Sequence, residues 1–145
     1  MSFVISNKRQ CYRYTTTNGL LIKDAAELCQ KNGGKLPIPK SQEEQDLLIN
    51  MLNNKIPKKV HFPIDLQLNN FNTYVMSNGK EPTWTKWFPG QPKGNGKQKF
   101  VQIGDYGSPL WLDLSPTEPV YDIVCQQVCS SGTLTLAVFK ISNRS

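Results

Sequence analysis

The spacing of apolar residues changes along the chain, and the first change marks a strand followed by a helix. Residues 11–17 are rich in aromatic and β-branched side chains and stop at Asn18-Gly19, which predicts a strand and a turn. Helical spacing follows, up to residues 32–34, which tolerate the left-handed conformation at a helix end. The apolar positions of this helix are Leu21, Ala25, Leu28 and Cys29.

A second helix is predicted to begin after Ser41. The Ser41 hydroxyl can cap the first turn, and Glu44 completes a capping box three residues later. The helical pattern ends at Pro57. The expected buried stripe of this helix consists of Leu47, Leu48, Met51 and Leu52.

Beyond Pro57 the chain alternates short apolar runs with turn-forming residues, a pattern typical of strands. Two helices followed by short strands predict an α+β fold class. The expected strands are residues 61–68, 74–76, 100–103, 110–112 and 121–128.

The C-terminal residues 133–141 alternate imperfectly between apolar and polar side chains. Ser130-Ser131-Gly132 could turn this segment back as an extra strand. The alternative is a partly ordered terminus whose apolar residues contact a partner chain.

Length and composition indicate a single domain over residues 1–145. The chain has 145 residues, 38% of them hydrophobic, and no low-complexity segment or internal repeat divides it. No apolar run approaches the roughly 18 residues that a membrane-spanning helix needs, so we expect no membrane span.

The four cysteines lie at positions 11, 29, 125 and 129, without a C-x-x-C pair, and His61 is the only histidine. Two disulfides are therefore a better interpretation than a metal site. Three pairings are possible, and one that joins the first third of the chain to the last would remove the most unfolded-state entropy. Disulfides imply an oxidising compartment, so we expect a secreted, extracellular protein whose precursor carries a signal sequence.

Several short motifs follow one another in a recognisable order. They are A-x-x-x-C at 25–29, G-G-x-L at 33–36, WTKWFPGQPK at 84–93, WLD at 111–113 and YDIVC at 121–125. In this order they resemble the C-type lectin family over roughly residues 11–128. The resemblance implies a C-type lectin-like fold, with two helices, a small antiparallel sheet and a long irregular ligand loop. Residues 63–66 depart from it, because they read PIDL where the family has W-I-G-L.

In calcium-dependent members of that family, the segments W-x-x-G-[EQ]-P-[ND] and W-N-D hold the calcium ion that coordinates a sugar. Here Lys93 replaces the Asp or Asn of the first segment, and Leu112 replaces the Asn of the second. Gln91 and Asp113 remain, whereas calcium takes about six to eight oxygen ligands. We therefore expect no metal or other cofactor at the usual site. The alternative is a shifted calcium site, built from backbone carbonyls with Asp105, Asp113, Glu118 or Asp122.

The same resemblance implies the disulfide pairing. It pairs Cys29 on the first helix with Cys125 on the last strand. Cys11 and Cys129 then remain, on strands that lie antiparallel in the family fold, so a second bridge within the chain is plausible. The competing interpretation is an intermolecular disulfide and a covalent homodimer.

The loop that binds ligands in the family is basic in this chain. Residues 80–99 carry five lysines against one acid, Glu81, and the net charge is +6. A positive loop would repel a divalent cation and attract an anion. Our leading hypothesis is a calcium-independent carbohydrate-recognition module that favours anionic or sulfated glycans. The candidate ligand-binding residues are Trp84, Lys86, Gln91, Lys93, Lys97, Lys99 and Asp113.

Other interpretations of this loop remain open. Its lysines could be an ordinary solvated surface. Trp87 and Trp111 are expected in the core, whereas Trp84 is expected to be exposed and to offer a flat face to a sugar ring. Gln91-Pro92 is expected to preserve the loop conformation through a cis peptide.

A second function class is a protein-binding or dimerising module without sugar activity. The apolar segments 3–5 and 134–141 favour it, because unpaired strands can complete the sheet of a partner. An enzyme is not expected, since the single His61 offers no nucleophile-base pair. Nucleic acid is not an expected partner either, because disulfides argue against a compartment where it is found.

Overall fold

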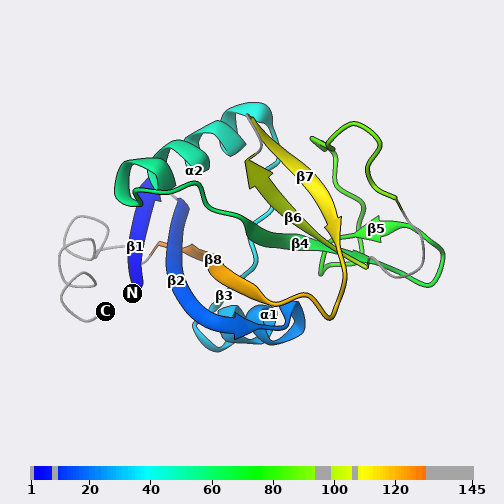
Figure 1. Cartoon of the computed structure of the whole chain (residues 1–145), viewed down its shortest axis with the longest axis horizontal. Helices are drawn as coiled ribbons and strands as arrows, with labels where there is room; N and C mark the ends of the chain where they lie inside the picture. Colours follow the sequence, from blue (N-terminus) through cyan, green and yellow to red (C-terminus); the bar gives the residue numbers. More distant parts are fainter. Residues whose placement is uncertain (1, 8–9, 94–98, 106–107, 130–145) are drawn as a thin grey trace.

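The computed structural model describes residues 2–7, 10–93, 99–105 and 108–129, and these residues form two antiparallel four-stranded sheets and two helices (Figure 1). The α+β class predicted from the sequence is confirmed. In chain order the elements are β1 (Ser2–Asn7), β2 (Gln10–Leu20), α1 (Ile22–Lys31), β3 (Gly34–Lys35), α2 (Gln42–Lys55), β4 (Phe62–Leu68), β5 (Tyr74–Val75), β6 (Phe100–Asp105), β7 (Pro109–Leu114) and β8 (Val120–Val128).

The first sheet joins the two ends of the described chain, in the strand order β1-β2-β8-β3. β1 pairs with β2, so that Val4 lies opposite Arg13. The expectation that segment 3–5 is an unpaired strand is therefore wrong, because this segment pairs with β2 of the same chain. Segment 133–141 lies outside the described residues.

β2 does not stop at the turn predicted at Asn18-Gly19. The strand continues to Leu20 through a register shift between Thr16 and Leu20, where Gly19 has φ +110°. A β-bulge absorbs the turn-forming residues without ending the strand. Asn18-Gly19 therefore marks an irregularity within the strand and not its end.

Two disulfides fasten this sheet. Cys29 of α1 is bonded to Cys125 of β8, with the two Cα atoms 5.3 Å apart. Cys11 of β2 is bonded to Cys129, which follows β8, with a Cα separation of 5.2 Å. Both bonds lie within the chain, and every cysteine is paired.

The two helices bury faces that differ in part from the predicted ones. In α1, Ala25 and Cys29 are buried as expected, but Leu21 precedes the helix as its N-cap and is 46% exposed. In α2, Leu48 and Leu52 are buried, whereas Leu47 is 37% exposed and was wrongly assigned to the core.

The fully buried Gln45 explains the error at Leu47. The buried residues of α2 are Gln45, Leu48, Ile49 and Leu52, which recur at helical spacing on one face. The predicted cap at Ser41 is present, because its Oγ accepts a hydrogen bond of 3.1 Å from the Glu44 backbone N–H.

The second sheet has the strand order β5-β4-β6-β7, and its edge strand β7 holds residues 111–113 of the motif that resembles the family's ligand site. The larger core cluster unites α2 with strands of both sheets and includes the fully buried Trp111 of β7. A smaller cluster lies beneath α1. No helix among the described residues has the length and apolar character needed to cross a membrane.

Candidate ligand-binding site

Residues 84–93 run alongside the outer edge of β7. The backbone N–H of Trp111 donates to the carbonyl of Lys86 at 2.7 Å, and the N–H of Phe88 donates to the carbonyl of Trp111 at 2.9 Å. These bonds form a parallel bridge between Trp87 and Trp111. β7 thus fixes the position of the whole segment.

Gln91 and Asp113 bond to the backbone of this loop. The Gln91 Oε1 accepts a hydrogen bond of 3.1 Å from the Asp113 N–H, and the Asp113 Oδ2 accepts one of 2.5 Å from the Lys93 N–H. The Gln91-Pro92 peptide bond is cis, as expected from the sequence. These two side chains therefore close the loop onto β7.

This arrangement does not fit a calcium ion at the family's usual position. The two remaining oxygen-bearing side chains already accept backbone N–H groups, and Lys93 and Leu112 offer no further carboxylate or amide oxygen. A hard cation that takes about six to eight oxygens would have to break both hydrogen bonds and would still lack ligands.

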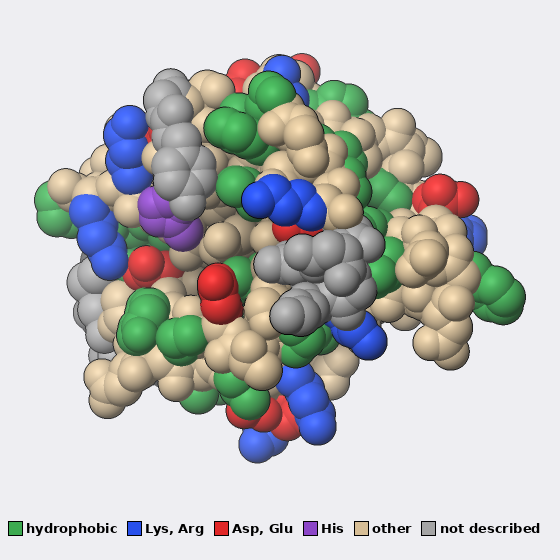
Figure 2. Space-filling model, turned by 45° about the vertical axis from the view of Figure 1, so that its right-hand side comes forward, with side chains coloured by type: hydrophobic (Ala, Val, Ile, Leu, Met, Phe, Trp, Pro, Cys, Tyr) green, Lys and Arg blue, Asp and Glu red, His purple; other side chains and the backbone are tan. Residues whose placement is uncertain are grey.

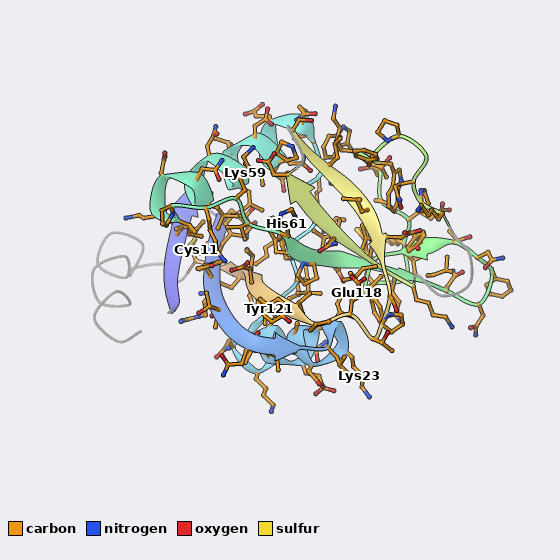
Figure 3. All side chains as sticks on the ribbon, in the orientation of Figure 1. Cys11, Lys23, Lys59, His61, Glu118 and Tyr121 are labelled. Atoms are coloured by element: carbon orange, nitrogen blue, oxygen red, sulfur yellow. A yellow bond between two sulfur atoms is a disulfide. The ribbon has the colours of Figure 1, made fainter. Side chains whose placement is uncertain are left out.

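Among the described residues, no three His, Cys, Asp or Glu side chains form a group that could hold a metal ion, so the side chains alone do not build the shifted calcium site that was the alternative. Asp105 is paired with Lys59 at 3.5 Å, and Asp122 with Lys58 at 3.4 Å. Figure 3 shows Glu118 well apart from Lys59. Asp105 and Asp122 thus pair with different lysines, and Asp113 bonds to the backbone of the loop.

Three tryptophans pack together beneath the loop. Trp111 is fully buried, and its ring meets those of Trp84 and Trp87 edge-on, with ring centroids 5.7 and 5.8 Å away. Trp84 and Trp87 are half-buried against the core. The expectation that Trp84 is freely exposed is wrong, because the Trp111 ring offers it an edge-to-face contact.

Gln45 of α2 binds the indole of Trp111 and the backbone beside it. Its Oε1 accepts a hydrogen bond of 2.7 Å from the Trp111 Nε1, and its Nε2 donates to the Pro109 carbonyl at 3.0 Å. The apolar pattern of α2 does not reveal this role, because Gln45 is polar and the buried stripe was predicted from apolar residues. The helical spacing of Gln45 to Leu48 and Leu52 was the available signal.

Tyr74 is a second residue whose role the sequence did not suggest. Its ring lies 5.5 Å from that of Trp87. Burial, together with the negative charge of Asp113, raises the pKa of Tyr74 to about 12. The carboxylate of Asp113 therefore influences a half-buried phenol as well as the Lys93 backbone.

Three exposed lysines of the candidate site are anchored to β7 through their backbone. Lys86, Lys93 and Lys99 bond to Trp111, Asp113 and Leu114 respectively. Because a strand rises about 3.3 Å per residue, these attachments fall within about 10 Å along β7. Lys97, the remaining candidate, lies outside the described residues.

We call Lys86, Lys93 and Lys99 the β7 lysines. Figure 2 shows Lys and Arg side chains at separate places on one face of the molecule, with acidic side chains beside several of them. The attachment points of the β7 lysines, spread over about 10 Å along the strand, suit a ligand with several separated negative groups better than a single small anion.

The chain matches the family model described as "Lectin C-type domain" over residues 18–127. Among similar solved structures is the C-type lectin CEL-I from Cucumaria echinata, at 20% identity and a TM-score of 0.74, covering 85% of this chain and 93% of that one. The C-type lectin domain of murine dendritic cell inhibitory receptor 2, solved with an N-glycan, is 20% identical with a TM-score of 0.72, covering 87% and 96%.

Herring type II antifreeze protein is also similar, at 16% identity and a TM-score of 0.74, covering 88% of this chain and 97% of that one. These likenesses confirm the expected C-type lectin-like fold. Identities this low concern the fold alone, and a lectin and an antifreeze protein share it.

Proposed function

The chain belongs to the C-type lectin domain family, and on that premise we propose that it is an extracellular recognition module that binds anionic or sulfated glycans without calcium. The proposed binding surface comprises the β7 lysines. The proposed activity is binding and not catalysis. We further propose that residues 1–145 act as one recognition domain.

The observation that carries this proposal is the closure of the loop by Asp113 and Gln91. Their oxygens bond to the backbone N–H groups of Lys93 and Asp113. Hydrogen bonds within the protein therefore hold the loop at the place where calcium-dependent relatives would use a metal ion. Lysine side chains at its surface can then attract an anion without competition from a bound cation.

An extracellular location is supported by the two disulfides. They close segments of 118 and 96 residues, and such bonds persist in oxidising compartments. Acidic and sulfated glycans are ligands available outside the cell, which agrees with the charge of the loop.

The experiment is a binding titration of the oxidised protein with a sulfated heparin-type oligosaccharide, in chelator and at rising salt. We expect binding that weakens with salt, because exposed charges are screened over about 10 Å at 0.1 M ionic strength. Lys86→Gln and Lys93→Gln should each weaken it. Lys23→Gln is the matched control, because Lys23 lies on α1, apart from β7 (Figure 3). Equal effects of all three substitutions would refute a specific role for the β7 lysines.

One observation favours a second candidate, a protein-binding or dimerising module. Phe71 is 86% exposed at the turn between β4 and β5. The Asn69 Oδ1 orders this turn by accepting hydrogen bonds from the N–H groups of Phe71 and Thr73, at 2.9 and 3.0 Å. A preformed turn that presents an aromatic side chain is a suitable anchor for a protein interface.

Sedimentation of the full chain would test this candidate. If Phe71 mediates self-association, Phe71→Ser should convert a dimer into a monomer. Leu47→Ser, which removes an exposed apolar side chain from the outer face of α2, should leave the dimer intact. A wild-type protein that remains monomeric at high concentration would contradict dimerisation through Phe71.

A further inference from the structure

A cleft lies between α1 and the hairpin of β4 and β5, and its lining includes neither β7 nor residues 84–93. Its volume is about 490 Å³. Small-ligand sites span roughly 300–1,000 Å³. Ile22, Ala26 and Gln30, which recur every four residues along α1, form one wall. The facing wall comes from β4, β5 and the turns that follow them.

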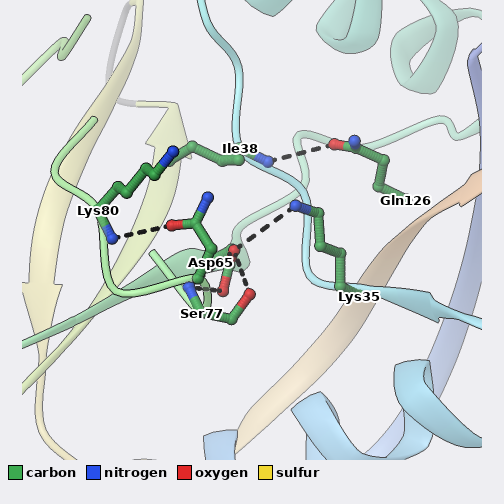
Figure 4. A network of polar contacts seen from close by, with 7 residues as sticks. Lys35, Ile38, Asp65, Ser77, Lys80 and Gln126 are labelled. Atoms are coloured by element: carbon green, nitrogen blue, oxygen red, sulfur yellow. Dashed lines mark hydrogen bonds and ion pairs between the residues drawn. The ribbon is translucent and has the colours of Figure 1, made fainter. Parts of the chain in front are cut away.

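An acidic and a basic side chain meet at this cleft (Figure 4). The Asp65 Oδ2 accepts a hydrogen bond of 3.0 Å from the Ser77 hydroxyl, and the Ser77 N–H lies 3.2 Å from both carboxylate oxygens. The Lys35 ammonium lies 3.9 Å from the Asp65 Oδ2, beyond hydrogen-bonding distance. The Asp65 side chain is 12% exposed and that of Lys35 is 45% exposed.

Both groups retain the capacity to bind a ligand. An ionised carboxylate can accept about four hydrogen bonds, and among the described side-chain contacts Asp65 takes three, all from Ser77, which leaves about one for a ligand. The Lys35 ammonium keeps its donors, because its contact with Asp65 is an ion pair without a hydrogen bond. An acceptor and a donor are thus available side by side.

The backbone holds this pair in place. The Asp65 N–H donates to the Pro37 carbonyl at 2.9 Å, which ties β4 to the segment after β3. Ser77 lies in a tight turn closed by a bond of 2.8 Å from the Met76 N–H to the Lys80 carbonyl. A site built on such fixed elements needs little reorganisation to bind a ligand.

The rest of the cleft combines amides with apolar surface. Gln30, Gln67 and Asn70 are exposed, and within the described part of the chain their amides make no side-chain hydrogen bond. An amide donates and accepts at once, as does a sugar hydroxyl. Met76 and Phe100 are half-buried and supply apolar surface.

We propose that this cleft binds a neutral saccharide, with Asp65 and Lys35 sharing the hydroxyl groups of one ring. The charges of Asp65 and Lys35 cancel. The Asp65 carboxylate would repel a phosphate or sulfate ester, and the Lys35 ammonium would repel an organic cation. A neutral polyhydroxylated ligand satisfies both groups, and the amides at the rim can bind its other hydroxyls. This second site does not depend on the β7 lysines or on calcium.

The test uses methyl glycosides of neutral hexoses and N-acetylhexosamines in chelator, with backbone amide chemical shifts as the readout. We expect shifts at Lys35, Gln67 and Ser77 and none at Lys93. Ala26→Met, which fills the cleft from α1, should weaken binding by about tenfold or more. Glu27→Met is the control, because Glu27 is exposed on the same helix and does not line the cleft.

Asp65→Asn keeps the size of the side chain but removes the charged acceptor, and it should also weaken glycoside binding. Unchanged shifts elsewhere in the spectrum would show that each variant is folded. The proposal is overturned if no glycoside perturbs the cleft amides, or if Ala26→Met binds as tightly as Glu27→Met. Binding of a sulfated oligosaccharide should survive Ala26→Met, which separates failure at this cleft from failure at the β7 lysines.

Discussion

The Asp113 carboxylate accepts a hydrogen bond from the backbone N–H of Lys93. This bond joins the end of the loop to β7 at the position where the family's sugar-binding segments would hold a metal ion. Lys93 thus has two roles, since its backbone fixes the loop and its exposed side chain adds positive charge to the surface.

Asp113→Ala should loosen the loop locally. A hydrogen bond to a charged group contributes about 1.5–3 kcal/mol, so its loss should speed hydrogen exchange at the Lys93 amide by about tenfold or more. Asp24→Ala, which removes an exposed acid from α1, should leave that exchange unchanged. If Lys93 exchanges equally fast in wild type and Asp113→Ala, the bond does not hold the loop.

A calcium site should be recoverable by substitution. Lys93→Asp combined with Leu112→Asn adds the two missing oxygen ligands beside Gln91 and Asp113 and removes a positive charge. In a calorimetric titration with calcium, we expect a heat of binding for the double variant and none for Lys23→Asp. If the double variant does not bind calcium, this loop differs in geometry from the calcium-binding loops of the family.

Alkaline pH should destabilise the protein through Tyr74. The folded state raises the pKa of Tyr74 from 10.0 to about 12, first through burial and then through Asp113. A raised folded pKa contributes stability that is fully present below pH 10 and is lost as the pH rises toward 12.

Tyr74→Phe should therefore reduce the loss of unfolding free energy between pH 10 and about 12. Tyr121→Phe is the control, because Tyr121 is 55% exposed. Equal alkaline losses in both variants would show that the Tyr74 pKa is not raised as described.

Gln45→Leu should destabilise the fold even though it replaces a polar core residue by an apolar one. It would leave the buried Trp111 N–H without its acceptor, which costs about 1–3 kcal/mol. Urea denaturation measures this loss, with Gln42→Leu on the exposed side of α2 as the control. Gain of stability in Gln45→Leu would mean that packing outweighs the hydrogen bond.

Local patterns predicted most helices and strands of this fold. The cap at Ser41, the strands β4 and β8 and the helix face of Ala25 and Cys29 follow from residue type and spacing within a few positions. Strand β1 was not predicted as part of the sheet, because its pairing with β2 depends on a contact that its own sequence does not specify.

The candidate site was less predictable, because it depends on contacts between distant segments. The sequence revealed which calcium ligands are replaced, but not that Asp113 binds the Lys93 backbone. The half-buried position of Trp84 depends on Trp111, and the buried position of Gln45 depends on the same ring. A pattern of apolar residues does not reveal a polar residue, such as Gln45, that is buried because it hydrogen-bonds to a buried partner.

The most direct measurement is a pair of calorimetric titrations of the oxidised wild-type protein, first with calcium and then with a sulfated heparin-type oligosaccharide in calcium and in chelator. We predict that calcium produces no heat of binding and that the oligosaccharide binds with equal strength in both buffers. Calcium binding accompanied by chelator-sensitive glycan recognition would contradict it, because the metal would then have displaced the hydrogen bonds that close the loop.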